Sequence, residues 1–194
     1  MKTLRVVRRQ GWRIIAVVLL VVAYFVVYRM ASMLDGAAIV LPTPQERAPF
    51  RVDFQLPDVQ GHLVRQSDLR GQVVLINIWA TWCYPCRLEM PSMNALYKDY
   101  HAKGLAIVAI ATDTEGKSVV APFIQAYGLT FPVVLDPQNL VGAQLQVPGI
   151  PMSYLLDKRG RIVGFEVGAR DWNTRKIRRL LDQMLAEESG GTTP

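Results

Sequence analysis

The chain has 194 residues, of which 51% are hydrophobic and 20% are charged, as is typical of one globular domain with an additional apolar segment. Its formal net charge of +6 comes from residues 1–34, which contain six basic side chains and no acidic one. In the rest of the chain the basic and acidic side chains are equal in number. The folded part therefore has no surplus of positive charge for phosphates, and we expect no nucleic-acid binding.

The first distinctive segment is an uncharged apolar run of 15 residues at 14–28, with five basic residues before it and Arg29 after it. Such a helix is about 22 Å long, short of a hydrocarbon core of about 30 Å, but Arg13 and Arg29 can snorkel and apolar residues continue further. We expect an uncleaved transmembrane anchor at 14–34, with residues 1–13 in the cytoplasm and the remainder outside. A cleaved signal peptide and a buried core helix are the alternatives.

A proline-containing segment at 35–48 is predicted to be a linker, followed by a folded domain at 49–188 and a flexible tail at 189–194. The domain should begin with a β-hairpin that turns at Gly61 and a short helical turn that ends at Gly71. Apolar patterns then predict strands at 72–80, 105–113 and 132–136, helices at 87–101, 118–128 and 139–147, a hairpin at 152–168, and a closing helix from Asp171, its expected N-cap, to Glu188. Strands that are apolar throughout need cover on both faces, which predicts an α/β fold with helices on both sides of a central sheet.

Both cysteines occur in WATWCYPCRLEMP, residues 79–91, with two residues between them. A structural zinc site needs four ligands, whereas this chain adds only two distant histidines, so we expect no metal site, although a lone Cys-x-x-Cys can bind soft metals weakly. A purely structural disulfide would close a very short ring and remove little chain entropy. A redox pair fits better, because Cys83 would lie at a helix N-terminus, where backbone N–H groups stabilise a thiolate. Cys86, one turn further in, would resolve the mixed disulfide, and no bound cofactor is needed because the sulfurs carry the electrons.

Two longer strings, NIWATWCYPCRLEMP (77–91) and VPGIPMSYLLDKRGRIV (147–163), resemble the landmarks of the thioredoxin superfamily. The first is similar to membrane-anchored, extracytoplasmic reductases of the TlpA/ResA type, close to CcmG/DsbE. The resemblance implies a thioredoxin-like fold with a central mixed sheet, in which Cys83 attacks and Cys86 resolves. It also implies that Pro151 is cis and faces the cysteines, so that the Ile150 backbone is free to pair with a substrate chain.

Further site residues follow from the same resemblance. Trp82 matches the aromatic residue beside the attacking sulfur, and we expect Tyr84 and Pro85 to contribute to substrate binding with it. Thioredoxins proper carry a buried Asp where this chain has Asn77, which cannot accept a proton. Glu89, three residues after Cys86, matches a glutamate of TlpA/ResA reductases, and i,i+3 spacing would bring it near the sulfurs. Partial burial would raise its pKa toward that of a general base, the alternative being a solvated surface residue.

The resemblance thus predicts a thiol-disulfide oxidoreductase that works as a reductase on protein disulfides, in cytochrome c maturation or oxidase assembly. Its implied location is the bacterial inner membrane, single-pass, with the domain in the periplasm and a DsbD/CcdA-type electron donor in the membrane. A thiol peroxidase of related fold is one alternative, but NIWATWC lacks the Pro-x-x-x-Thr/Ser-x-x-Cys loop of that class. A copper-handling module is another, with Met90 and Met93 close to the pair.

Overall fold

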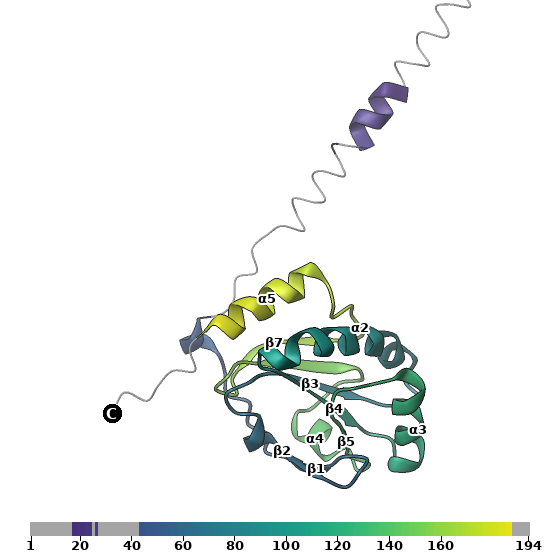
Figure 1. Cartoon of the computed structure of the whole chain (residues 1–194), viewed down its shortest axis with the longest axis vertical. Helices are drawn as coiled ribbons and strands as arrows, with labels where there is room; N and C mark the ends of the chain where they lie inside the picture. The colour runs from purple at the N-terminus through teal and green to yellow at the C-terminus, as the bar shows by residue number, and fades with distance from the viewer. Residues whose placement is uncertain (1–16, 25, 27–42, 188–194) are drawn as a thin grey trace, which may run out of the picture. The chain divides into compact units, whose positions relative to one another are not determined.

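The computed structural model describes residues 17–24, 26 and 43–187 (Figure 1). The chain divides into two compact units, and in the first of them the described residues are helical with exposed side chains. Among the described residues, no helix has the length and apolar character needed to cross a membrane. Most of the predicted anchor at 14–34, most of the predicted linker and the tail at 189–194 lie outside this part of the chain.

The second unit is built on a five-stranded sheet in the order β5-β4-β3-β6-β7 (Figure 1). Its parallel part comprises β3 (Val73–Trp79), β4 (Leu105–Ala111) and β5 (Val133–Leu135). Next to β3 lie β6 (Met152–Leu156) and then β7 (Ile162–Val167), each antiparallel to its neighbour. Every residue of β3 is buried, as its uninterrupted apolar run predicts for a strand covered on both faces. The sheet is therefore mixed, as expected.

Helices cover both faces of this sheet. One hydrophobic cluster joins it to three helices: α2 (Tyr84–Tyr100), α3 (Lys117–Tyr127) and α5 (Arg175–Ala186). On the other face, the short α4 (Leu140–Gln144) and the extended residues 50–54 contribute to a second cluster. The predicted N-terminal hairpin is present as β1 (Gln55–Pro57) and β2 (Leu63–Arg65), and single 3₁₀ turns occur at η1 (Pro44–Glu46), η2 (Gln66–Leu69) and η3 (His101–Lys103). The expected α/β architecture is confirmed.

Capping sets the start of two helices. Helix α2 begins at Tyr84, three residues before the apolar pattern at 87–101, with Cys83 at its N-terminus as predicted: Cys83 is the N-cap, and its sulfur accepts the Cys86 N–H. Helix α5 begins at Arg175, since the Thr174 hydroxyl accepts the Ile177 N–H at 3.3 Å. The proposed cap Asp171 is wrong: its carboxylate accepts the Asn173 N–H instead, in a turn before the helix.

Arg47, inside the segment predicted as linker, packs into the folded unit. Its side chain is 1% exposed and donates to Asp157 at 3.1 Å and to Glu187 at 2.6 and 2.7 Å. Lys158 also donates to the carbonyl oxygens of Leu185 and Glu187. These bonds fasten the start of the described unit and the end of α5 to the turn between β6 and β7.

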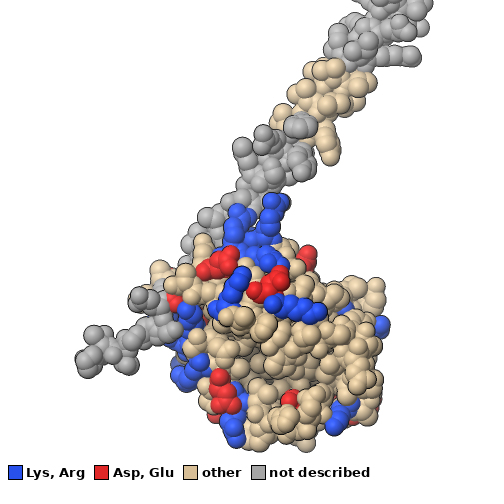
Figure 2. Space-filling view, viewed as in Figure 1, with Lys and Arg blue, Asp and Glu red and all other residues tan. Residues whose placement is uncertain are grey.

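Basic side chains gather over α5 (Figure 2). Arg175, Lys176 and Arg179 are exposed on this helix, whereas Ile177 and Leu181 face the core. These three basic residues therefore form a solvated face of α5.

Candidate active site

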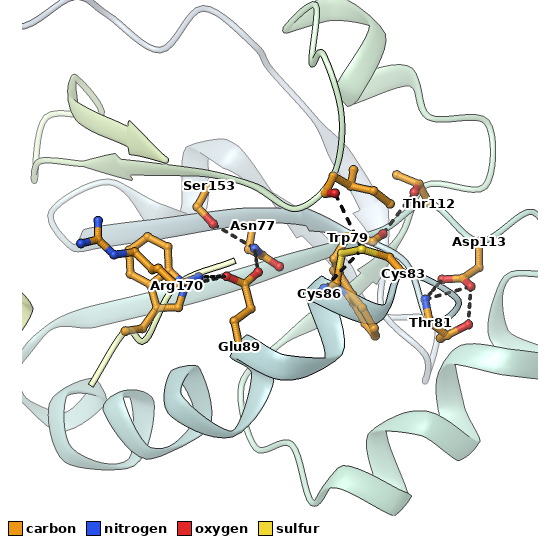
Figure 3. Close-up of a disulfide and its surroundings, with 12 residues drawn as sticks. Asn77, Trp79, Thr81, Cys83, Cys86, Glu89, Thr112, Asp113, Ser153 and Arg170 are labelled. Atoms are coloured by element: carbon orange, nitrogen blue, oxygen red, sulfur yellow. Dashed lines mark hydrogen bonds between the residues drawn. A yellow bond between two sulfur atoms is a disulfide. The ribbon is translucent and has the colours of Figure 1, made fainter. Parts of the chain in front are cut away.

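Cys83 and Cys86 form a disulfide at the point where the loop after β3 enters α2 (Figure 3). Cys83 caps the helix, and its Sγ accepts the Cys86 backbone N–H at 3.3 Å. Pro85 lies in the first turn, where a missing N–H leaves no donor unpaired. Helix N-terminal N–H groups and the helix dipole therefore act on Cys83 Sγ, as predicted for the sulfur that becomes a thiolate.

The two sulfurs differ in access to solvent. Cys83 is 5% exposed and Cys86 is 0% exposed. Cys83 is thus only slightly accessible in the disulfide form, and Cys86, one turn further in, is the more buried of the two. Only Cys83 offers any surface to a reaction partner in this state.

The loop before β6 closes over the same sulfur. The Ile150–Pro151 peptide bond is cis, as the resemblance implied. Cys83 Sγ lies 3.8 Å from the Ile150 carbonyl oxygen; in the disulfide form the sulfur has no proton to donate, so this is a contact and not a hydrogen bond. Among the described residues, Ile150 makes no backbone–backbone hydrogen bond, so its peptide groups are available to another chain.

An apolar rim surrounds the cysteine pair. Trp82 is 68% exposed, Tyr84 66% and Leu88 60%, and Pro85 between them is also exposed. Single exposed apolar side chains are common on protein surfaces, but several that lie together mark a contact surface. Trp82, Tyr84 and Pro85 thus flank Cys83 with exposed side chains, and Leu88 is exposed one turn further along α2.

Glu89 does not lie on the surface. It is 1% exposed, and its carboxylate points toward Asn77 and Arg170, with no hydrogen bond to either sulfur among the described residues (Figure 3). Its oxygens accept from Asn77 Nδ2 at 2.8 Å, Trp172 Nε1 at 2.9 Å and the Arg170 backbone N–H at 3.4 Å. The alternative of a solvated glutamate is wrong, and the expected approach to the sulfurs is replaced by a contact with Asn77.

Burial raises the pKa of Glu89 above its ordinary value of 4.5. Hydrogen bonds from Trp172, Asn77 and Arg170 oppose this effect, and the negative charge of Glu166 adds to it. The direction is the one predicted from partial burial, because desolvation disfavours the charged form. Glu89 is thus a buried carboxyl group one turn below the disulfide with a pKa closer to neutrality.

Asn77 connects Glu89 to β6. Its Nδ2 donates to Glu89 and also to Ser153 Oγ at 2.9 Å, while its Oδ1 is buried without a hydrogen-bond partner in the described structure (Figure 3). An amide cannot accept the cysteine proton as a carboxylate would, but its oxygen can accept a hydrogen bond. Asn77 therefore supplies two donors to the site and holds one acceptor unused.

Sequence reasoning missed three residues of this site. Trp172 and Arg170, in the loop before α5, reach Glu89 across 83 and 81 residues of sequence. Asp113, after β4, accepts three hydrogen bonds from Thr81, two residues before Cys83. Only Asp113 had a readable signal, because it follows a strand that is parallel to β3 and the carboxyl ends of such strands meet at one edge.

Metal ligands are not grouped in the part of the chain that the structure describes: no three His, Cys, Asp or Glu side chains lie together as a metal site requires. The donor set at the cysteine pair is the two sulfurs, which are bonded to each other.

Known proteins share this architecture. The AhpC/TSA family model matches residues 44–165, more than half of the chain. Thiol-disulfide oxidoreductase ResA of Geobacillus kaustophilus is 44% identical over 110 residues, which cover 57% of this chain and 63% of that protein. Thioredoxin-like protein YneN of Bacillus subtilis is 42% identical over 118 residues, or 60% of this chain and 68% of that protein. The match thus spans slightly less than two thirds of the ResA relative.

Solved structures of thiol-disulfide exchange proteins share this fold. A thiol:disulfide interchange protein of the thioredoxin family from Chlorobium tepidum is 29% identical with a TM-score of 0.60, over 77% of this chain and 100% of that one. StoA from Bacillus subtilis is 25% identical with a TM-score of 0.57, over 70% and 97%. The sheet order, the cysteine pair at the start of α2 and these similarities lead to one conclusion: the chain belongs to the AhpC/TSA family, as a thioredoxin-like protein of the TlpA/ResA/CcmG type.

Proposed function

We propose that the protein is a thiol-disulfide oxidoreductase that exchanges disulfides with protein substrates through Cys83 and Cys86. The observation that carries this proposal is the disulfide at the N-terminus of α2, in which one sulfur accepts a helix N–H and the other is completely buried. Relatives that match this region are named thiol-disulfide oxidoreductases. The asymmetry supports different roles for the two sulfurs.

In the proposed reaction, the reduced Cys83 thiolate attacks one sulfur of a substrate disulfide, which forms a mixed disulfide and releases one substrate thiolate. Cys86, as thiolate, then attacks Cys83 Sγ, which forms the intramolecular disulfide of this structure and releases the second substrate thiolate. Two electrons pass from the dithiol to the substrate. A further cycle needs an external dithiol to reduce the pair again.

Glu89 is the proposed acceptor of the Cys86 proton. Its raised pKa suits a general base, and it lies on the same helix three residues further on. Since its carboxylate contacts Asn77 and not a sulfur, a water molecule or a rotamer change has to complete the path in the dithiol state. Once protonated, Glu89 becomes a donor, and rotation of the Asn77 amide would present the unused Oδ1 as its acceptor.

Substrate binding is proposed to use the apolar rim and the Ile150 backbone together. Trp82, Tyr84 and Pro85 would contact side chains that flank the substrate cysteine, and Ile150 would pair with the substrate backbone as an added strand. Pro151 lies directly after the pairing residue, and its peptide bond to Ile150 is cis. Backbone pairing tolerates many sequences, so the rim would set the preference for apolar neighbours.

We also propose that the direction is reductive and that the domain works outside the cytoplasm of a bacterium, held at the inner membrane by residues 14–34. The concentration of basic residues before the apolar run supports this orientation. A membrane electron carrier of the DsbD/CcdA type would re-reduce the pair, and cytochrome c maturation or oxidase assembly would supply substrates. A reporter fused after Pro194 should be active only outside the cytoplasm, and cytoplasmic activity would contradict this placement.

Turnover of a model protein disulfide tests the activity. The reduced full chain should cleave the disulfides of insulin in the presence of a chemical reductant, and Cys83→Ser should abolish this activity. Equilibration with glutathione then gives the potential of the pair, expected below about −200 mV for a reductase. A value near about −120 mV, typical of a strong oxidant, would contradict the reductive direction.

A further inference from the structure

A buried carboxylate lies under the turn that delivers Cys83 to α2. Asp113 is 1% exposed and accepts the Thr81 backbone N–H at 3.1 and 3.0 Å and the Thr81 hydroxyl at 2.5 Å (Figure 3). Thr81 belongs to the turn Ala80–Cys83, which is closed by a hydrogen bond from the Cys83 N–H to the Ala80 carbonyl at 3.2 Å. All three bonds to the carboxylate therefore come from one residue of this turn.

Sheet register explains how Asp113 reaches the turn. Strands β3 and β4 are parallel neighbours, and Trp79 is paired with Ala111, so both strands end at the same edge. Thr112 then donates its N–H at 2.9 Å and its hydroxyl at 3.1 Å to the Trp79 carbonyl. Residues 112–113 thus bind the chain from 79 to 81, immediately before the cysteine pair.

In the described structure, the side-chain hydrogen bonds of Asp113 all come from Thr81. Among residues 17–24, 26 and 43–187, no Lys or Arg forms an ion pair with it. A buried carboxylate without a cation is unfavourable unless hydrogen bonds stabilise it, and here those bonds are given by Thr81. The side chain of Asp113 therefore binds only the turn that precedes the cysteine pair.

We propose that Asp113 is a positioning residue for the thiol-disulfide exchange: it holds the turn 80–83 so that Cys83 Sγ meets the first N–H groups of α2 and the Ile150 carbonyl. This role rests on the proposed function. Asp113 would act through Thr81, without contact to the reacting sulfurs. The sulfur accepts the Cys86 N–H at 3.3 Å, and a helix N-terminus acts only over the first turn. A turn that moves by a fraction of an ångström weakens this stabilisation of the thiolate.

Loss of the Asp113 carboxylate should therefore change the thiol pKa and the reactivity of Cys83. In Asp113→Ala, the thiol pKa of Cys83 should rise, because its thiolate loses support from the helix N-terminus. Loss of the carboxylate charge alone would instead lower this pKa, so a rise is specific to the positioning role. The reduction potential of the pair should become more negative, because a less stable thiolate makes the reduced form less favourable. The rate of Cys83 alkylation at neutral pH should fall about tenfold. Turnover on insulin should also fall about tenfold, mainly through a lower kcat.

Asp136 provides a matched control. It is also 1% exposed, follows β5 of the same sheet, and accepts two backbone N–H groups, from Leu140 at 3.0 Å and Val141 at 2.9 Å. Its bonds hold the start of α4 rather than the cysteine turn. Asp136→Ala should lower the thermal stability to a similar degree but leave the Cys83 thiol pKa unchanged and the alkylation rate within about twofold of the original.

Thr81 gives a second test that does not disturb a buried position. Thr81→Val removes only the hydroxyl bond and should produce an intermediate rise in the Cys83 pKa, whereas Thr81→Ser keeps the bond and should behave like the original. Combined with Asp113→Ala, Thr81→Val should have no additional effect, since its partner is already absent. Asp113→Asn retains one acceptor oxygen and should lie between Asp113→Ala and the original.

The measurement is the pKa of Cys83 in the reduced full-chain protein, obtained from the pH dependence of its alkylation by iodoacetamide. Every variant also carries Cys86→Ser, so that only Cys83 reacts. Equal shifts for Asp113→Ala and Asp136→Ala, or additive effects of the Thr81 and Asp113 changes, would overturn the positioning role. This titration needs no substrate. A protein that reduces no disulfide but shows the predicted shifts would contradict the proposed function alone, and the reverse pattern would contradict only the role of Asp113.

Discussion

Glu89→Gln tests how the buried carboxyl group contributes to stability. The change removes the charge while keeping the size of the side chain, which is 1% exposed. Because burial raises the pKa of Glu89, the folded protein binds its proton more tightly than the unfolded chain does. Glu89 therefore contributes stability that is fully present below pH 4.5 and is lost as the pH rises through the folded-state pKa.

The magnitude follows from this linkage. Each unit by which the folded pKa exceeds its unfolded value corresponds to about 1.4 kcal/mol of stability lost by high pH. Glu89→Gln lacks this dependence. The free energy of unfolding of the variant should therefore increase relative to that of the original protein as the pH rises, and the difference between the two should become constant above the folded-state pKa of Glu89. Hydrogen bonding adds an offset that does not depend on pH: one oxygen of Gln can accept from Trp172, while its amide faces Asn77, which can rotate to accept.

Urea unfolding of the disulfide form between pH 4 and 8 measures this difference without cysteine titration. Glu46→Gln is the control, because hydrogen bonds from the Thr43 hydroxyl and backbone lower the Glu46 pKa and its stability contribution is lost as the pH falls. The two variants should therefore show opposite trends. A difference for Glu89→Gln that stays constant over this range, or that declines with pH, would refute the assignment of a raised pKa.

Further predictions concern residues around this network and the domain edge. Trp172→Phe removes the Nε1 donor that lowers the Glu89 pKa, so the pH profile of insulin reduction should move to higher pH; an unmoved profile would separate Glu89 from the reaction. Arg47→Ala leaves Asp157 buried with fewer partners and should lower the free energy of unfolding by about 3 kcal/mol in urea, whereas a change below about 1 kcal/mol would show that Arg161 compensates. Leu88→Ala should raise KM for insulin severalfold with little change for a small aromatic disulfide, and equal effects would exclude a substrate contact.

The parts of the fold that depend on local pattern could be predicted from the sequence. The apolar run of β3 and the helical pattern after the cysteines locate the strand-to-helix junction, and Cys83 is the N-cap of α2. Capping itself was harder to predict, since several polar residues before α5 can act as a cap. The structure shows that Thr174 makes the capping bond and that Asp171 forms a turn.

Contacts across long stretches of sequence could not be predicted. The resemblance to TlpA/ResA reductases and the spacing from Cys86 make Glu89 a candidate, but its partners depend on how the loop before α5 returns to the sheet. Trp172 had no pattern of its own, because a single aromatic residue in a polar loop has many equivalent positions. Asp113 could have been inferred from the parallel pairing of β3 and β4, once the two strand ends are placed side by side.

Trapping of the mixed disulfide tests the central claim most directly. The reduced Cys86→Ala protein is mixed with an oxidised protein substrate, and mass spectrometry locates the attached chain. The proposed roles of the two sulfurs predict a stable adduct on Cys83 and none with Cys83→Ala, in which the remaining sulfur is completely buried. An adduct that forms equally well in Cys83→Ala, or no adduct with any protein disulfide, would contradict the assignment of Cys83 as the attacking nucleophile.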